Sequence, residues 1–181
     1  MIKTTNLPPN LRPLVNWSVM AASIVLCCWL SLARLPGMEL LGLGPNWLLI
    51  WVVSWSVKRS IWQGAMAGLV LGLVQDGMTS VAPSSILSLV IVGVMTSRIQ
   101  KQKYIQEDFI SIALIVFAMA LVGETITAIQ YIVSGIGDIG EIWLDHQRFA
   151  LASAILSSLW APVVYYPLSV WWYKIDDLEQ K

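Results

Sequence analysis

The sequence predicts an all-α membrane protein, a six-helix transmembrane bundle with both termini on the cytoplasmic side. Hydrophobic residues make up 57% of the 181 residues and charged residues only 12%, a composition too apolar for an ordinary soluble domain. The apolar residues form blocks of about 17–25 residues, the length that crosses a bilayer. These blocks leave no room for a separate soluble domain. We therefore expect one transmembrane domain over 14–173, with a short cytoplasmic segment at 1–13 and a short tail at 174–181.

The six expected spans are residues 14–33, 40–57, 60–76, 81–97, 109–133 and 149–172. The first ends in Ser31-Leu32-Ala33, which resembles a secretion-signal cleavage site. Its apolar run is longer than the about 7–15 residues of a signal peptide, which favours a retained span. Cys27 and Cys28 lie next to each other inside it and lack metal-site spacing, so they are expected to act as small apolar side chains.

The basic residues set the predicted orientation. With the N-terminus inside, nine of the eleven fall on the cytoplasmic side: Lys3, Arg12, Lys58, Arg59, Arg98, Lys101, Lys103, Lys174 and Lys181. Arg34 and Arg148 fall outside. This positive-inside bias predicts that both ends face the cytoplasm. The net charge of zero and the lack of a basic stripe argue against a nucleic-acid partner.

The connections predict which spans are neighbours. The stretch 34–46 is rich in glycine and proline and is expected to be an outer turn region. Lys58-Arg59-Ser60 is so short that the second and third spans must form an antiparallel hairpin, and the turn at 77–83 extends this to the fourth span.

The last part of the sequence predicts a long outer loop and an irregular helix. Residues 134–148 are expected to be the longest extramembrane piece, in which Ile139, Ile142 and Trp143 share one face of a short interfacial helix. Pro162 and Pro167 each remove a backbone hydrogen bond, so the last span is expected to be kinked or locally unwound.

The second span carries Trp47, Trp51 and Trp55 at four-residue spacing, which places the three rings on one helix face. Bulk in the protein core or facing lipid explains such a stripe, and so does a surface for a partner helix.

The third span carries Gly64, Gly68 and Gly72 at the same spacing and ends at Gln75-Asp76. In lipid, a Gly-xxx-Gly stripe lets another helix backbone come close. Asp76 is either a solvated helix end or an anchor for the helix that meets the stripe, whether from this chain or from a partner.

Glu124 lies near the middle of the fifth span, where an acid is costly and faces the interior of the bundle. Thr127, Ala128 and Tyr131 follow on the same face. Three interpretations compete: a protonated acid hydrogen-bonded within the bundle, part of a ligand pocket, or a proton relay.

The sequence offers no catalytic, cofactor or metal constellation. His146 is the only histidine, and no nucleophile stands beside a base and an orienting group. No glycine-rich phosphate loop follows a strand. We therefore expect a non-enzymatic protein without a cofactor.

The stretch 45–76 resembles the MreD family of bacterial rod-shape-determining membrane proteins. Pro45-Asn46-Trp47-Leu48-Leu49 opens the second span, a basic turn follows, and the third span ends in Gly72-Leu73-xx-Asp76. Pro83-Ser84-Ser85 stands where the family commonly has a glycine, and Ser60 where a proline is frequent.

The resemblance implies a scaffold subunit of the wall-elongation machinery in the bacterial inner membrane. Its implied partners are the bitopic protein MreC and, in the same complex, MreB filaments and the wall synthases; self-association stays open.

The family is also similar in fold to the S components of energy-coupling-factor transporters. The alternative is therefore a small-molecule- or lipid-binding transporter subunit, with Glu124, Gln130, Tyr131 and Gln75 meeting in an outer-leaflet cavity.

Overall fold

The computed structural model describes residues 12–33, 44–79, 83–99, 109–135 and 139–179. These residues form helices and turns and contain no strand, as the sequence predicts. The helices are α1 (Arg12–Leu32), α2 (Trp47–Ser56), α3 (Ile61–Thr79), α4 (Ser85–Ile99), α5 (Phe109–Val133) and α6 (Ile139–Glu179). Most of the expected turn at 34–46 and of the cytoplasmic stretches 1–13 and 98–108 lies outside the described residues.

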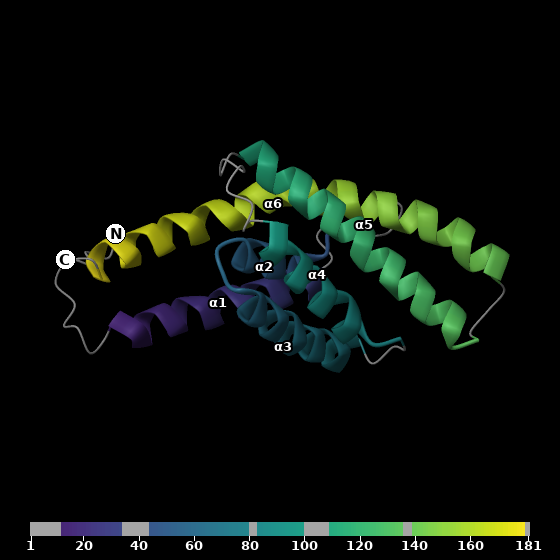
Figure 1. The fold of residues 1–181 in the computed structure, drawn as a ribbon, viewed down its shortest axis with the longest axis horizontal. Coiled ribbons are helices and arrows are strands. Elements are labelled where there is room, and N and C mark those ends of the chain that lie inside the picture. Colours follow the sequence, from purple (N-terminus) through teal and green to yellow (C-terminus); the bar gives the residue numbers. More distant parts are fainter. Residues whose placement is uncertain (1–11, 34–43, 80–82, 100–108, 136–138, 180–181) are drawn as a thin grey trace.

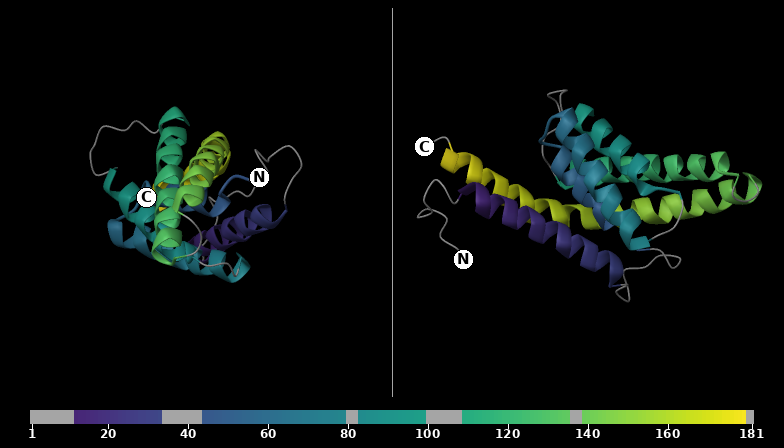
Figure 2. Two further views of the ribbon diagram at one scale, coloured as in Figure 1. Left: turned by 90° about the vertical axis from the view of Figure 1, so that its right-hand side faces the viewer. Right: turned by 90° about the horizontal axis from the view of Figure 1, so that it is seen from below.

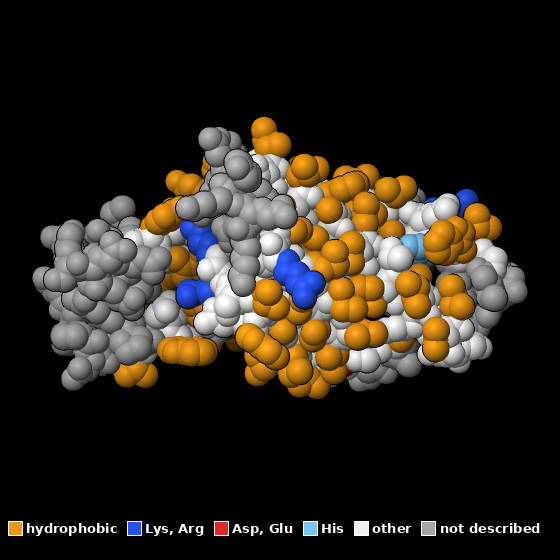
Figure 3. All heavy atoms as spheres, in the orientation of Figure 1, with side chains coloured by type: hydrophobic (Ala, Val, Ile, Leu, Met, Phe, Trp, Pro, Cys, Tyr) orange, Lys and Arg blue, Asp and Glu red, His pale blue; other side chains and the backbone are white. Residues whose placement is uncertain are grey.

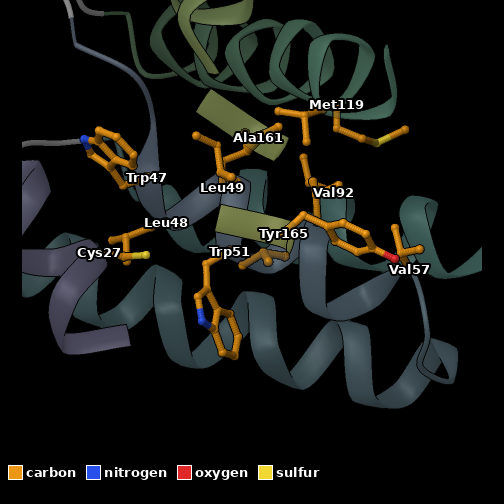
Figure 4. Close-up of a cluster of buried hydrophobic side chains, with 14 of the residues drawn as sticks. Cys27, Trp47, Leu48, Leu49, Trp51, Val57, Val92, Met119, Ala161 and Tyr165 are labelled. Atoms are coloured by element: carbon orange, nitrogen blue, oxygen red, sulfur yellow. The ribbon is translucent and has the colours of Figure 1, made fainter. Parts of the chain in front are cut away.

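Helix α2 lies at the centre of the molecule and contacts α1, α3, α4, α5 and α6. Every residue of α2 except Trp55 is buried. Figure 4 shows its side chains meeting Cys27 of α1, Val92 of α4, Met119 of α5 and Ala161 of α6. Burial on all sides requires an apolar sequence without a polar face, and Trp-Leu-Leu-Ile-Trp-Val-Val meets that requirement.

The other helices form two antiparallel pairs and an edge (Figures 1 and 2). Helices α3 and α4 pack along each other on one side of α2, and α5 packs along the first half of α6. Helix α1 lies at the edge beside the second half of α6, and among the described helices its main contacts are with α2. The start of α1 and the end of α6 lie at the same end of the molecule.

The turn between α2 and α3 is as short as its sequence predicts. The Arg59 amide donates to the Ser56 carbonyl at 3.2 Å, which closes the turn. The Ser60 amide donates to Gln63 Oε1 at 3.2 Å, half of a capping box that satisfies a donor at the start of α3. Ser60 thus starts the helix at the position where the MreD pattern often has proline.

Helix α6 departs from expectation at its start. It begins at Ile139 and runs for 41 residues, so most of the segment expected as the loop 134–148 is the first part of this helix. No glycine or proline lies between Gly140 and Pro162, which allows the helix of the last span to begin earlier and to include the predicted interfacial helix.

Both prolines lie inside α6, which remains helical through Pro162 and Pro167. The helix bends midway along its length (Figure 2). A proline removes one hydrogen bond and crowds the preceding turn, so a long helix bends there without ending.

Three of the described helices are long and apolar enough to cross a membrane: α1 over Leu14–Leu32, α5 over Phe109–Val133 and α6 over His146–Tyr173. Apolar side chains cover much of the surface in Figure 3. Helices α2, α3 and α4 are not long and apolar enough to count as membrane spans, so the expectation of six spans is not met by length and composition. Helix α2 has ten residues, about 15 Å against a hydrocarbon core of about 30 Å, because Asn46 caps it and Gly44-Pro45 precede the cap.

Candidate functional site

The glycine stripe of α3 lies against α4 of the same chain. A Cβ added at Gly68 would lie 2.7 Å from Val90 Cα, and one added at Gly72 would lie 2.5 Å from Ile86 Cα. A Cβ added at Gly64 would lie 2.6 Å from the Gly93 carbonyl oxygen. These separations are too short for any side chain, so the backbones of α3 and α4 are in direct contact along the stripe. We call this contact the α3–α4 seam.

Helix α4 contributes small residues to the α3–α4 seam that the sequence analysis did not single out. Gly93 leaves no room for a Cβ against the Gly64 backbone. Ser97 Oγ donates to the Gly93 carbonyl at 2.9 Å and to the Ser56 carbonyl of α2 at 3.3 Å. The signal was present in the sequence, because Gly93-xxx-Ser97 repeats the small-residue spacing of α3.

Asp76 closes the seam at the C-terminal end of α3. Its Oδ1 accepts from the Ser85 amide at 2.6 Å, and its Oδ2 accepts from the Ser84 hydroxyl at 2.6 Å. A carboxylate at a helix N-terminus satisfies a free amide and interacts favourably with the helix dipole. Asp76 therefore fixes the turn that brings α4 back along α3.

Replacing Asp76 with alanine is expected to lower the free energy of unfolding by about 1 kcal/mol, the usual cost of losing a helix cap. The measurement is unfolding of the purified chain by sodium dodecyl sulfate. Asp76→Asn keeps an acceptor for the Ser85 amide and should fall between the two. Equal stability of wild type and Asp76→Ala would show that the cap does not hold the turn.

The tryptophan face of α2 is also occupied within the chain. The Trp47 and Trp160 rings lie 5.6 Å apart, and Trp55 meets Trp172 at 5.4 Å. Trp51 Nε1 donates to Ser23 Oγ of α1 at 2.9 Å. The stripe thus joins α2 to α1 and α6.

Glu124 lies at the contact between α5 and α6. The Ser153 hydroxyl of α6 hydrogen-bonds its carboxyl group. Thr127 Oγ1 donates to the Gly123 carbonyl at 3.1 Å, and the same carbonyl accepts from Ser88 Oγ of α4 at 3.1 Å. This arrangement places the acid inside the helix packing, where a hydroxyl partner offsets part of the cost of burial.

No hydrogen bond among the described residues joins the remaining polar candidates, Gln75, Gln130, Tyr131 and His146, to one another. Gln75 Oε1 and Gln130 Oε1 are buried atoms without a hydrogen-bond partner among the described residues. Tyr131 is half-buried near the C-terminal end of α5. His146 packs on the Trp143 ring at 5.6 Å. Within the described ranges, no three His, Cys, Asp or Glu side chains gather as metal ligands would.

Helix α6 carries a buried stripe of small residues that the sequence analysis missed: Ala150, Ala154, Ser157 and Ala161. Ser157 Oγ accepts from the Asn46 amide at 3.0 Å, which ties the start of α2 to α6. The near-four-residue spacing was a readable signal, hidden because the large side chains between these positions dominate the hydropathy.

Comparison with known proteins identifies the family. The profile described as "rod shape-determining protein MreD" matches residues 11–174, which includes all of the helices α1 to α5 and most of α6. No curated protein matches the chain, and no solved structure does. The family implies a membrane protein with a role in rod-shape determination. With nearly the whole chain matched, this protein belongs to the MreD family.

Proposed function

We propose that this chain is a non-enzymatic membrane scaffold of the cell-wall elongation machinery. In this role it binds MreC and helps to couple cytoplasmic MreB filaments to the peptidoglycan synthases. The observation that carries the proposal is the family match over residues 11–174. The packing agrees with a scaffold role, because the tryptophan stripe of α2 and the glycine stripe of α3 both pack against other helices.

The proposed setting is the bacterial inner membrane, with the chain crossing it several times and all six helices lying within the bilayer. Helix α2 is short, but the other helices enclose it, so it need not span the lipid by itself. The start of α1 and the end of α6 share one end of the molecule (Figure 1), which supports placing both termini on the same side of the membrane; the positive-inside bias favours the cytoplasmic side. In this arrangement residues 1–13 and 174–181 are cytoplasmic, although α6 continues to Glu179.

We propose α1 as the surface that meets the transmembrane helix of MreC. The stripe of Gly64, Gly68 and Gly72 and the stripe of Trp47, Trp51 and Trp55 are already packed within the chain. Of the three helices able to cross a membrane, α1 is the least enclosed, with 11% of its most apolar 18-residue stretch buried. Its exposed side includes Ser18, Ala21 and Ala22, small residues that permit close approach of a second helix.

The test is purification of the tagged full chain from membranes that contain MreC of the same organism. We expect MreC to be retained, and a photo-crosslinking residue at Leu26 of α1 to form a covalent adduct with it. The matched position is Met66 of α3; Leu26 and Met66 are 55% and 57% exposed, and Met66 should give no adduct. Failure of the folded chain to retain MreC would overturn the proposed function. An adduct at Met66 and none at Leu26 would move the binding surface to α3.

The second candidate is a subunit that binds a small molecule or lipid, as an S component does. The buried, unpartnered oxygens of Gln75 and Gln130 favour it, because such atoms call for a polar partner. A ligand-dependent rise in the unfolding temperature, with vitamins or lipid-linked wall precursors as probes, would support this candidate. No rise with any probe would count against it.

A further inference from the structure

Basic side chains gather at the end of the molecule where α2 ends and α3 begins. Lys58 and Arg59 form the turn between these helices. The end of α4 reaches the same place, because Ser97 Oγ donates to the Ser56 carbonyl at 3.3 Å and Arg98 is the next residue. Figure 3 shows Lys and Arg side chains in separate patches on a face that also carries many apolar side chains. We call Lys58, Arg59 and Arg98 the basic cluster.

Aromatic rings hold two of the three cations in place. Arg59 Cζ lies 4.4 Å from the centre of the Trp55 ring, and Lys58 Nζ lies 3.9 Å from the centre of the Tyr173 ring. The Trp55 ring is itself braced by Trp51 and Trp172, at 5.7 Å and 5.4 Å. A cation–π contact fixes a guanidinium without using its N–H donors. Arg59 is therefore pre-positioned to donate hydrogen bonds to an anion.

The acids whose side chains the structure describes lie away from the basic cluster. Asp76 is bound to Ser84 and Ser85 at the other end of α3. Glu124 is bound to Ser153 between α5 and α6. Neither of these two acids therefore lies beside Arg59 or Arg98.

Large apolar side chains are exposed beside the basic cluster and at the start of α5. Trp62, three residues after Arg59, is 82% exposed, and Ile110 at the start of α5 is also 82% exposed. Tyr173, which covers Lys58, is 58% exposed. Basic groups directly beside exposed rings and aliphatic chains match the boundary between phosphate headgroups and acyl chains. An acidic protein segment would match the charge but not the apolar surface that continues from it.

We propose that the basic cluster is a binding site for the phosphate headgroup of an anionic phospholipid, with Arg59 and Arg98 as its main donors. The inference rests on the proposed membrane orientation, which places this end in the cytoplasmic leaflet, and it is independent of MreC. Guanidinium groups suit the task because they bind phosphate through two parallel hydrogen bonds. The lipid chains then lie along the exposed apolar faces of α3 and α5.

The test uses the full chain, purified without MreC and placed in bilayers of mixed phosphatidylcholine and phosphatidylglycerol. Lipid that remains bound after detergent extraction is quantified. We expect phosphatidylglycerol to be enriched about fivefold or more over its bulk fraction, the effect of about one well-placed basic residue near an anionic surface. The double variant Arg59→Gln, Arg98→Gln is expected to lose the enrichment. The control Arg148→Gln removes an exposed arginine in the first half of α6, away from the cluster, and should keep it.

Two further arms define the ligand and guard against a folding defect. The double variant must unfold at the wild-type temperature in pure phosphatidylcholine. If it unfolds at a lower temperature, the single variant Arg98→Gln, which leaves Arg59 stacked on Trp55, is used instead. Excess glycerol phosphate is expected to leave the lipid bound, and displacement would assign the cluster to a soluble phosphate. Enrichment that is absent in wild type or unchanged in the variants overturns the proposal. The proposal is also overturned if the variants retain lipid as wild type does but no longer bind an acidic peptide.

Discussion

Replacing Gly68 with alanine is expected to destabilise the isolated chain by about 3 kcal/mol, the upper range for overpacking a tight contact. The added Cβ would lie 2.7 Å from Val90 Cα and 2.6 Å from the Leu89 carbonyl carbon. Both are backbone atoms of α4, so no side-chain rotation relieves the clash and the two helices must separate. The measurement is the free energy of unfolding of the purified chain in sodium dodecyl sulfate.

Gly77→Ala is the matched control for this prediction. Gly77 lies in the same helix, and a Cβ added there meets nothing within 4 Å. Alanine has a higher helix propensity than glycine by about 1 kcal/mol, so this variant should be as stable as wild type or more so. Equal effects of the two substitutions would show that helix propensity, and not contact with α4, decides the outcome.

Replacing Trp51 with alanine is expected to cost about 3 kcal/mol, the lower end of the range for removing a buried aromatic side chain. Trp51 is 4% exposed, stacks on Trp55 at 5.7 Å and donates to Ser23 of α1. Its loss leaves a cavity at the centre of the molecule and removes a hydrogen bond that attaches α1. Unfolding in sodium dodecyl sulfate measures the change, and mild proteolysis should show α1 cleaved first.

Two control variants show how large the effect of Trp51→Ala is. Trp62→Ala removes an indole that is 82% exposed on α3 and should change the stability by less than about 0.5 kcal/mol. Trp51→Phe keeps an aromatic ring but loses the donor to Ser23, so it should lie between wild type and Trp51→Ala. If Trp62→Ala proved as damaging as Trp51→Ala, the central position of α2 would be wrong.

The helical class and the neighbours of α3 could be read from the sequence because both follow from local patterns. Glycines at four-residue spacing predict close helix contact, and the short turns at Lys58-Arg59-Ser60 and 77–83 leave few helices able to make it. The structure supplies which of the two neighbours fills the stripe. It is α4, because its own Gly93 and Ser97 give the matching small surface.

The burial of α2 could not be read from hydropathy. In a membrane protein, lipid-facing and core-facing segments are both apolar, so composition does not separate them. The same ambiguity left both core packing and a partner surface open for Trp47, Trp51 and Trp55. In the structure these side chains contact Ser23, Trp160 and Trp172 of the same chain.

Contacts between residues far apart in the chain could likewise not be predicted from the sequence. Glu124 signalled an interior position by its cost in lipid, but its partner Ser153 lies on a different helix, among several serines of α6. The length of α6 was misjudged because three glycines and several charges at 135–148 resemble a loop, whereas helix packing against α5 keeps the segment from Ile139 onward helical.

In this structure the glycine stripe of α3 packs against α4 of the same chain. The alternative is that the stripe binds the transmembrane helix of a partner. The direct measurement is the difference in free energy of unfolding between Gly68→Ala and Gly77→Ala, taken for the chain alone and again with the transmembrane segment of MreC bound. We predict the same difference of at least about 3 kcal/mol in both conditions, because α4 already occupies the stripe. Equal stability of the two variants alone, with a difference that appears only when MreC is bound, would contradict this and assign the stripe to the partner.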